Sequence, residues 1–208
     1  MAFERFWPDN LEQGEADTPA PKAGELLVKV GAVSLNFRDK AIVDGIYEPQ
    51  IATALGARVI ATSSKDSNLE AMKQLGAVAG VNYRTTPQWS AQVLELTQGN
   101  GVDLLLDVAG GDGINQSIAA TKAGGRIAQI GFLTGQTSNV NLMPMIFRQT
   151  TIRGIAVAPR SSFDRMNAFL NEHDIRPVID RVYSFEQARE AYEHLARGAF
   201  GKVVIKVG

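Results

Sequence analysis

The stretch GVDLLLDVAGG, residues 101–111, decides how the fold of this chain is interpreted. Residues 102–108 (VDLLLDV) have almost no polar interruption, which predicts a strand with helices covering both of its faces. Gly110 and Gly111 follow at once. Glycines after a strand either let the backbone approach a ligand closely or form a tight turn, and both interpretations stay open. The stretch therefore predicts a buried strand of a parallel sheet that ends in a glycine turn.

Strands and helices of about ten residues alternate on both sides of this stretch. The expected strands span residues 58–62, 79–83, 126–131 and 150–157, and the expected helices span residues 67–75, 86–98 and 113–122. Such alternation predicts βαβ units and a mostly parallel α/β sheet. Before it, residues 25–36 (ELLVKVGAVSLN) predict a strand. After it, residues 161–172 and 185–196 predict helices, and residues 178–183 and 202–207 predict strands. Ser184 and Gln187 are spaced for a capping box.

Composition excludes several classes of protein. The chain has 208 residues, a net charge of -1, 45% hydrophobic residues and no cysteine. The near-neutral charge argues against a nucleic-acid partner. The lack of cysteine excludes a thiolate zinc site, an iron–sulfur cluster and a cysteine nucleophile. No basic-then-apolar leader is present, and no apolar run approaches the roughly 20 residues of a membrane span. We expect a cytoplasmic protein that has no membrane partner.

Candidate ligand-binding residues follow the predicted strands, because parallel sheets bind ligands at the carboxyl ends of their strands. Ser63, Ser64 and Lys65 follow the strand at residues 58–62. A carboxylate there would bind the ribose 2′-hydroxyl of NAD, whereas hydroxyls and a cation suit the 2′-phosphate of NADP. The same residues also suit an ordinary helix start with Lys65 in solvent. Tyr83 and Arg84 end the next strand and are further candidates.

Other motifs are missing or ambiguous. Residues 107–111 and 131–135 both place glycines after a strand, where either a ligand or a tight turn explains them. The phosphate-binding pattern G-x-G-x-x-G does not follow the first strand. His173 and His194 are expected at the surface, since neither has a partner at metal-ligand spacing. Asp107 is expected to form a turn or cap and not to act as a general acid.

Four stretches together resemble one family. They are SLNFRD and DGIY at 34–39 and 44–47; GARVIATSSK, LGA and VNYR at 56–65, 75–77 and 81–84; GVD, DVAGG, GGR and IG at 101–103, 107–111, 124–126 and 130–131; and IDR, Ala188, AY and GKVV at 179–204. The chain resembles the medium-chain dehydrogenase/reductase superfamily, in its zinc-independent NADPH:quinone oxidoreductase branch. That branch transfers hydride from NADPH to a quinone or an activated enone.

The resemblance implies roles for individual residues. Asn36 stands where zinc-dependent relatives place a catalytic cysteine, so no metal is expected, and Asn36, Asp39 and Tyr47 would line the nicotinamide and substrate pocket. The implied cofactor-binding residues are Ser63, Ser64, Lys65, Tyr83, Ala109, Gly110, Gly131, Phe132, Leu133 and Lys202. The implied cofactor is NADP(H). The resemblance also implies a homodimer that pairs through the apolar strand at residues 150–157.

The sequence departs from the family between Pro49 and Gln50. Most of the catalytic domain, the first Rossmann strand and its glycine-rich turn are missing there, which indicates a large internal deletion. The expected fold is an incomplete Rossmann-type parallel sheet (residues 50–158) between remnants of a GroES-like β-rich catalytic domain (residues 1–49 and 159–208). The lost strand is central in the usual order, so its neighbours must pair together, borrow residues 25–36, or stay open. A remnant without turnover is the alternative to an active oxidoreductase. A zinc alcohol dehydrogenase fits less well.

Overall fold

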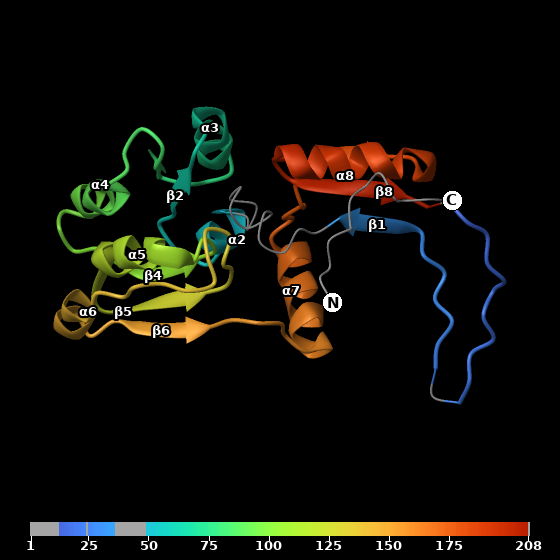
Figure 1. Ribbon diagram of the computed structural model, residues 1–208, viewed down its shortest axis with the longest axis horizontal. Helices are drawn as coiled ribbons and strands as arrows, with labels where there is room; N and C mark the ends of the chain where they lie inside the picture. The colour runs from blue at the N-terminus through green and yellow to red at the C-terminus, as the bar shows by residue number, and fades with distance from the viewer. Residues whose placement is uncertain (1–12, 24, 36–48, 208) are drawn as a thin grey trace. The chain divides into compact units, whose positions relative to one another are not determined.

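The computed structural model describes residues 13–23, 25–35 and 49–207 of the chain (Figure 1). The chain divides into two compact units. The first consists of Met1–Phe37 and Val178–Gly208, and the second is Arg38–Pro177. Each unit is described by itself. The expected division at residues 49 and 158 stays a prediction.

The second unit alternates helices and strands, as the sequence predicts. Its elements are α2 (Pro49–Ala54), β2 (Ile60–Ser63), α3 (Asp66–Gln74), β3 (Ala79–Asn82), α4 (Trp89–Leu96), β4 (Val102–Asp107), α5 (Ile114–Ala120), β5 (Thr121–Gln129), α6 (Leu142–Arg148), β6 (Thr151–Gly154) and α7 (Arg160–Glu172). Gly76 follows α3 with a φ of 106°, so a glycine ends this helix as expected. Helix α6 was not predicted. It begins after Asn141, whose side-chain oxygen accepts a hydrogen bond from the Met143 N–H at 3.2 Å.

The parallel sheet is interrupted where the sequence lacks a strand. β2 pairs in parallel with β3, and β4, β5 and β6 form a separate parallel sheet in that order. Within the described residues, β2 and β4 do not pair with each other and no strand lies between them. Of the three outcomes open from the sequence, the described strands show the open gap. This confirms an α/β fold with an incomplete Rossmann-type sheet.

One apolar cluster joins the two parallel sheets of this unit. Val81 of β3, Val93 of α4 and Ala120 of α5 are buried together. The partly buried residues packed against them come from both sheets and from α4: Ile60, Trp89, Val102 and Leu105. Gln116 of α5 adds polar ties, accepting from the Ser90 N–H at 3.0 Å and donating to the Pro87 carbonyl at 3.1 Å. The sheets are thus held in one packed body across the gap.

Strand β4 corrects one expectation from the sequence. It was predicted to be covered on both faces, but the side chains of Leu104 and Leu106 are 51% and 52% exposed. Side chains alternate between the two faces of a strand, and Leu105 packs into the cluster on the opposite face. The physical reason is the missing strand and its helix. A continuous apolar sequence such as that of β4 is typical of a central strand that is covered on both faces. In this chain β4 lies at a sheet edge.

The first unit has its own small mixed sheet. β8 (Lys202–Lys206) lies between β1 (Ala32–Leu35), with which it is antiparallel, and β7 (Ile179–Tyr183), with which it is parallel. Helix α8 (Ala188–Arg197) packs on this sheet and buries Ala191 and Leu195 in a cluster with Val203. The expected strand at residues 25–36 is therefore shorter at its start. Residues 25–31 are extended but form no strand, because no described strand pairs with them.

The capping box predicted before α8 is present. The Ser184 N–H donates to the Gln187 side-chain oxygen at 3.2 Å, and the Ser184 side chain caps in return. The expected helix from residue 185 opens as a 3-10 turn, Phe185–Gln187, before α8 begins. Among the helices that the structure describes, none is both long and apolar enough to cross a membrane.

Candidate functional site

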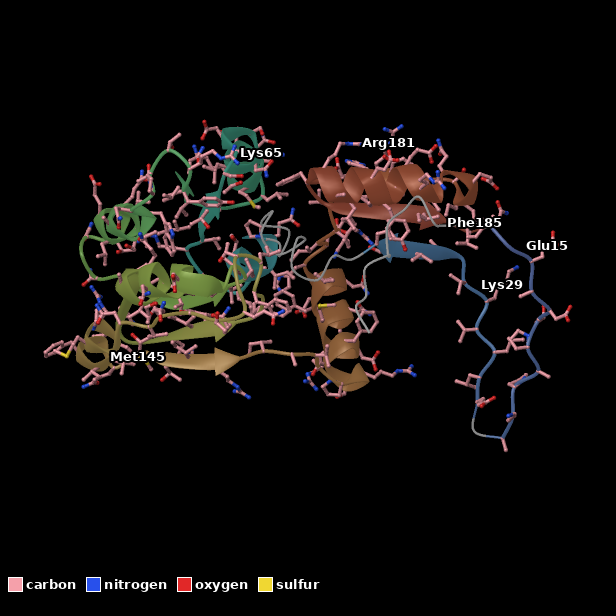
Figure 2. All side chains as sticks on the ribbon, in the orientation of Figure 1. Glu15, Lys29, Lys65, Met145, Arg181 and Phe185 are labelled. Carbon is pink, nitrogen blue, oxygen red and sulfur yellow. The ribbon has the colours of Figure 1, made fainter. Side chains whose placement is uncertain are left out.

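The carboxyl ends of β2 and β3 bring three of the predicted cofactor-binding residues together. The Lys65 N–H donates to the Ser63 hydroxyl oxygen at 3.3 Å, and the Tyr83 N–H donates to the Ser63 carbonyl at 3.1 Å. Ser63 is buried, so its side chain shapes this turn and does not face solvent. Ser64 is half-buried, and Lys65 is exposed at the start of α3 (Figure 2).

This corner favours a bound anion. Lys65 is the N-cap residue of α3, and no side chain caps the helix there. Uncapped N–H groups at a helix start carry partial positive charge, and the Lys65 ammonium adds to it. Asp66 opposes it, but its carboxylate accepts a hydrogen bond from the Asn82 side-chain amide at 2.7 Å. Residues 63–65 thus lead into an ordinary helix start, which was the alternative interpretation of their sequence. This arrangement is compatible with phosphate binding by Ser64 and Lys65.

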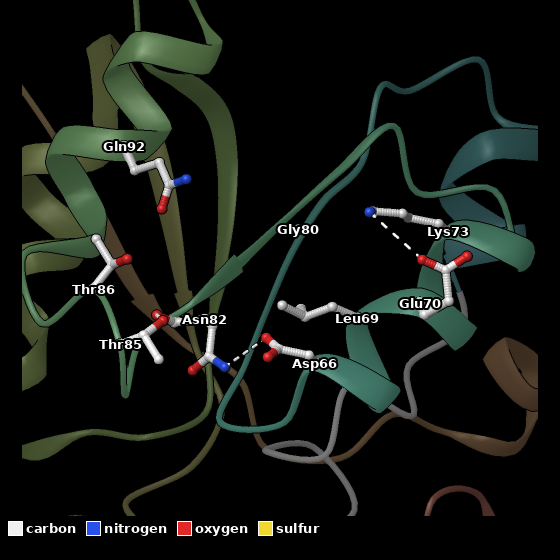
Figure 3. Close-up of a pocket in the computed structure, with 9 residues that line it drawn as sticks. All are labelled: Asp66, Leu69, Glu70, Lys73, Gly80, Asn82, Thr85, Thr86 and Gln92. Carbon is white, nitrogen blue, oxygen red and sulfur yellow. Dashed lines mark hydrogen bonds and ion pairs between the residues drawn. The ribbon is translucent and has the colours of Figure 1, made fainter.

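A polar cavity lies beside this corner, between α3, β3 and α4 (Figure 3). Its lining residues are Asp66, Leu69, Glu70, Lys73, Gly80, Asn82, Thr85, Thr86 and Gln92. Lys73 forms an ion pair with Glu70 at 3.6 Å, which leaves Asp66 as the unbalanced charge of the lining. A negative lining repels phosphate, and none of the predicted cofactor-binding residues belongs to it. We therefore do not assign the cofactor to this cavity.

The glycine turns after β4 and β5 pack against each other. The Gly111 N–H donates to the Gly135 carbonyl at 3.0 Å, and the Thr134 N–H donates to the Ala109 carbonyl at 2.8 Å. A Cβ atom on Gly131 would lie 2.3 Å from the Val108 carbonyl oxygen, and one on Gly110 would lie 2.8 Å from the Phe132 Cα. Glycine is required at these positions because the two loops lie in close contact. Of the two interpretations given for residues 107–111 and 131–135, this contact supports the tight turn.

Asp107 holds this pair of turns in place. One of its carboxylate oxygens accepts from the Ala109 and Gly110 N–H groups at 3.1 and 3.0 Å. The other accepts from the buried Ser117 hydroxyl. The expectation that Asp107 forms a turn is confirmed, and its link to Ser117 was missed. Asp107 and Ser117 are ten residues apart and belong to no common sequence motif, so the sequence alone does not indicate their contact.

The side chains that project from these turns are apolar. Phe132 is 50% exposed and Leu133 is also exposed, while Ala109 is half-buried. Gly110 and Gly131 are buried beneath them. The turns thus present an apolar surface at the carboxyl ends of β4 and β5. Such a surface can contact the flat ring of a ligand.

The remaining predicted residues are not brought to this site by the structure. Asn36, Asp39 and Tyr47 lie outside the described residues. Lys202 begins β8 in the first unit, where its N–H donates to the Val178 carbonyl at 2.8 Å. Their roles in a substrate pocket stay predictions.

His194 corrects another expectation. It was expected at the surface, but its Nδ1 lies 3.0 Å from the Tyr183 hydroxyl and its Nε2 lies 3.0 Å from Asp180 Oδ2. Asp180 Oδ2 also accepts from the Phe200 N–H at 3.1 Å. Tyr183 is buried. This chain of polar groups ties β7 to α8 inside the first unit, and residue spacing alone does not reveal it.

The described residues offer little to a metal ion. They contain no group of three or more His, Asp or Glu side chains that could hold one. The sequence has no cysteine and two histidines. Zinc sites in proteins are built mainly from cysteine and histidine, so these residues do not fit zinc.

The incomplete parallel sheet and its strand-end turns define a Rossmann-type domain of medium-chain dehydrogenases and reductases. The sequence profile of the zinc-binding dehydrogenase family matches residues 45–172. That match covers more than half of the chain, and the chain belongs to this family. The expected superfamily is thereby confirmed.

Three proteins illustrate the similarity. A zinc-type alcohol dehydrogenase-like protein of Schizosaccharomyces pombe is 41% identical over 163 residues, 76% of this chain and 47% of that protein. Quinone oxidoreductase-like protein 2 of Bos taurus is 27% identical, over 78% of this chain and 50% of that protein. The crystal structure of a proposed alcohol dehydrogenase from Sinorhizobium meliloti 1021 matches with a TM-score of 0.71 and 39% identity, over 76% of this chain and 46% of that one. The chain thus spans about half the length of the curated relatives it matches.

Proposed function

We propose that the chain is an NADPH-dependent oxidoreductase of the quinone and enone reductase type. It would transfer hydride from NADPH to a quinone or an activated carbonyl compound. Membership of a dehydrogenase family supports an oxidoreductase, and the similarity to a quinone oxidoreductase-like protein supports this acceptor class. Because the residues do not fit zinc, the proposed reaction is zinc-independent.

The end of β2 is the observation that carries the cofactor preference. Ser63 stands where NAD-specific folds place a carboxylate for the ribose 2′-hydroxyl. Lys65 is exposed two residues later, with the uncapped start of α3 beside it. In this proposal Ser64 and Lys65 bind the 2′-phosphate, Ser63 shapes the turn, and Tyr83 lies alongside. These groups fit NADP(H) better than NAD(H).

The other strand ends would bind the reactive part of the cofactor. When bound, the cofactor supplies the hydride, and the chain binds and orients it and excludes water. Phe132 and Leu133 would contact the nicotinamide side with their apolar surfaces, and Ala109, Gly110 and Gly131 would flank it with backbone. The hydrogen bonds of Asp107 keep this surface rigid. Asn36, Asp39, Tyr47 and Lys202 are proposed to complete the pocket.

A folded chain without turnover is the second candidate function. One observation favours it: β2 and β4 stay unpaired along the gap, where the strand that leads to the glycine-rich turn is absent. That turn normally holds the pyrophosphate at a helix start. In this candidate the chain keeps the adenosine end of the site but cannot hold the whole cofactor productively.

A homodimer is also proposed, paired through β6. This strand is at the edge of its sheet, and within the described residues only β5 pairs with it. Antiparallel pairing of two copies across a two-fold axis would extend the sheet.

Fluorescence titration with NADPH and with NADH tests the proposal directly. Circular dichroism first establishes that the chain is folded. Saturable binding of NADPH that is tighter than binding of NADH, followed by NADPH oxidation with a quinone, supports the oxidoreductase. NADPH binding without oxidation by any quinone or enone supports the second candidate. A folded chain that binds neither nucleotide contradicts the proposed cofactor site.

A further inference from the structure

Two strands of the second unit have open edges that face the same gap. Within the described part of the chain, β2 pairs only with β3 and β4 pairs only with β5. Ile60 of β2 and Leu105 of β4 pack against one cluster, so the two open edges belong to a single packed body. An open strand edge presents unpaired N–H and C=O groups and is a template for another strand.

The gap is apolar on the side of β4. Leu104 and Leu106 are half exposed on one face of this edge strand. Natural edge strands are usually protected by charges, prolines or bulges. On β4 the protection is limited to Asp103, which pairs with Lys122, and to an irregularity in the pairing with β5 between Val102 and Leu104. The hydrogen bond from Lys122 lowers the pKa of the Asp103 carboxyl. Residues 104–106 of β4 are apolar, which is typical of a strand that has another strand beside it.

A segment with matching character lies in the first unit. Residues 25–31 (ELLVKVG) are extended and exposed, with Leu26 at 90% and Val28 at 72% exposure. They form the return limb of a long loop that leads into β1 (Figure 1). Leu26, Val28 and Val30 alternate along the segment, which gives an extended strand one continuously apolar face. The segment is long enough to pair along all six residues of β4.

This segment, called the donor segment below, starts from a fixed point. The Gly31 carbonyl accepts a hydrogen bond from the Val207 N–H at 2.9 Å, and β1 follows directly at Ala32. Its backbone before Gly31 forms no ladder with any described strand. Transfer of exposed apolar side chains from water into an apolar environment is favourable, so pairing that buries this segment would be stabilising.

We propose that the donor segment of one chain inserts between β2 and β4 of a second copy of the chain, and the reverse. The second copy is favoured by symmetry. Each copy carries one donor segment and one gap, so two reciprocal insertions satisfy both and close around a two-fold axis. The insertion is an intermolecular strand addition of the kind that completes other sheets. It requires neither a nucleotide nor pairing through β6.

Cysteine cross-linking tests the contact, because the natural chain has no cysteine. An affinity-tagged chain with Val28→Cys is refolded together with an untagged chain with Leu104→Cys or Leu106→Cys. Tagged Leu27→Cys is used in parallel, since neighbouring residues of a strand point to opposite faces. Neighbouring strands are about 4.8 Å apart, within the range that a disulfide spans. We expect a disulfide-linked pair of tagged and untagged chains after mild oxidation, without nucleotide.

Glu15→Cys is the matched control donor. It lies on the outgoing limb of the same loop (Figure 2) and is also exposed, but residues 13–18 (QGEADT) carry no large apolar side chain. We expect it to give no linked pair with Leu104→Cys. Equal linkage of both donors would show random collision of a mobile loop and would overturn the proposal.

A proline pair supplies a second measurement. Val28→Pro removes a ladder N–H from the donor segment, while Ala16→Pro places the same residue on the outgoing limb. Both sites are exposed in the folded chain. The Asp107 carbonyl accepts from the Ile130 N–H on the β5 side, so by alternation the N–H groups of Leu104 and Leu106 point to the open edge. We expect slow hydrogen exchange of these two amides in the natural chain and in Ala16→Pro, and loss of that protection in Val28→Pro. Fast exchange at these residues in all three folded proteins would overturn the proposal.

Two further outcomes identify other occupants. A chain carrying both Val28→Cys and Leu104→Cys that closes its disulfide within a monomer would show that its own donor segment fills the gap. Protection of the Leu104 and Leu106 amides in a monomer that survives Val28→Pro would show a different occupant. Either result contradicts the second copy. Failure of NADPH binding leaves all of these readouts unchanged, so the two proposals fail separately.

Discussion

The Ser117 hydroxyl donates a 2.6 Å hydrogen bond to the Asp107 carboxylate, and both side chains are buried. The hydrogen bond joins α5 to the last residue of β4. The other carboxylate oxygen accepts from two backbone N–H groups of the following turn. A buried carboxylate is tolerated when every oxygen has donors, and this arrangement provides them. The geometry of the glycine turns therefore depends on Ser117.

Ser117→Ala is expected to destabilise the chain by about 1–3 kcal/mol, because it leaves a buried carboxylate oxygen without its hydroxyl donor. Urea unfolding followed by circular dichroism measures the change. Ser161→Ala on α7, where the serine is exposed, is the control and should shift the unfolding free energy by less than about 0.5 kcal/mol. Equal effects of the two substitutions would contradict the structural role of Ser117.

Lys65→Ala is expected to weaken NADPH binding by about tenfold or more, since a charged contact to phosphate is worth about 1.5–3 kcal/mol. NADH binding should change little, because NADH lacks the 2′-phosphate. Lys73→Ala is a matched control on the same helix, where the lysine pairs with Glu70. A Lys73→Ala loss as large as that of Lys65→Ala would place the phosphate elsewhere.

Asp66→Asn is expected to tighten NADPH binding. The substitution removes a negative charge next to Lys65 and keeps an oxygen that can accept from the Asn82 amide. The ratio of the NADH to the NADPH dissociation constant should rise, and high salt should diminish the gain. Glu70→Gln, one turn further along α3, should have a smaller effect. An unchanged ratio in Asp66→Asn would argue against a phosphate at this corner.

Gly154→Pro is expected to abolish pairing of two copies through β6. The Ile155 N–H bonds to Gln129 of β5, so by alternation the Gly154 N–H points away from β5, toward the open edge. Nothing lies within 4 Å of a Cβ at Gly154, so an added Cβ meets no neighbour there. Gly154→Ala keeps the N–H and is the control. Light scattering after size exclusion measures the mass, with Val28→Pro added to both variants to remove pairing through the donor segment. A dimer that survives Gly154→Pro in that background would contradict pairing through β6.

Tyr183→Phe is expected to destabilise the chain by about 1 kcal/mol, because it removes the hydroxyl that bonds to His194 Nδ1. Without the hydroxyl, the imidazole keeps its contact with Asp180 and its edge contact with the aromatic ring at residue 183. Tyr192→Phe is the control, since Tyr192 on α8 is exposed. Thermal unfolding compares the two variants, and equal melting temperatures would mean that the Tyr183 hydrogen bond contributes nothing.

Hydrophobic periodicity and glycine placement predicted the elements of this fold well. Gly76, for instance, ended a helix as expected, and Ser184 with Gln187 formed a capping box. Local patterns could not predict which strands lack neighbours. The sequence of β4 still encodes a central strand, so only the structure shows Leu104 and Leu106 exposed. Helix α6 was missed because its exposed side chains are apolar and give no amphipathic signal.

The candidate site was predictable where the ends of two paired parallel strands, β2 and β3, supply the residues. Ser63, Lys65 and Tyr83 were brought together because parallel strands end at the same edge of a sheet. The glycines after β4 and β5 were ambiguous, because contact with a ligand and contact with another loop demand the same residue. Ser117 and His194 act through partners on other elements, and spacing in the sequence carries no information about such contacts.

Trp89 packs against the cluster that joins the two parallel sheets, beside residues of β2 and β4. The chain has one other tryptophan, Trp7, which lies outside the described residues. In a Trp7→Phe chain, all tryptophan fluorescence would therefore come from Trp89, beside the cluster that joins the two parallel sheets. Its emission maximum would shift toward the red if the sheets separate and water enters, and toward the blue if a strand fills the gap. The interruption thus comes with an intrinsic optical reporter, which needs no added dye.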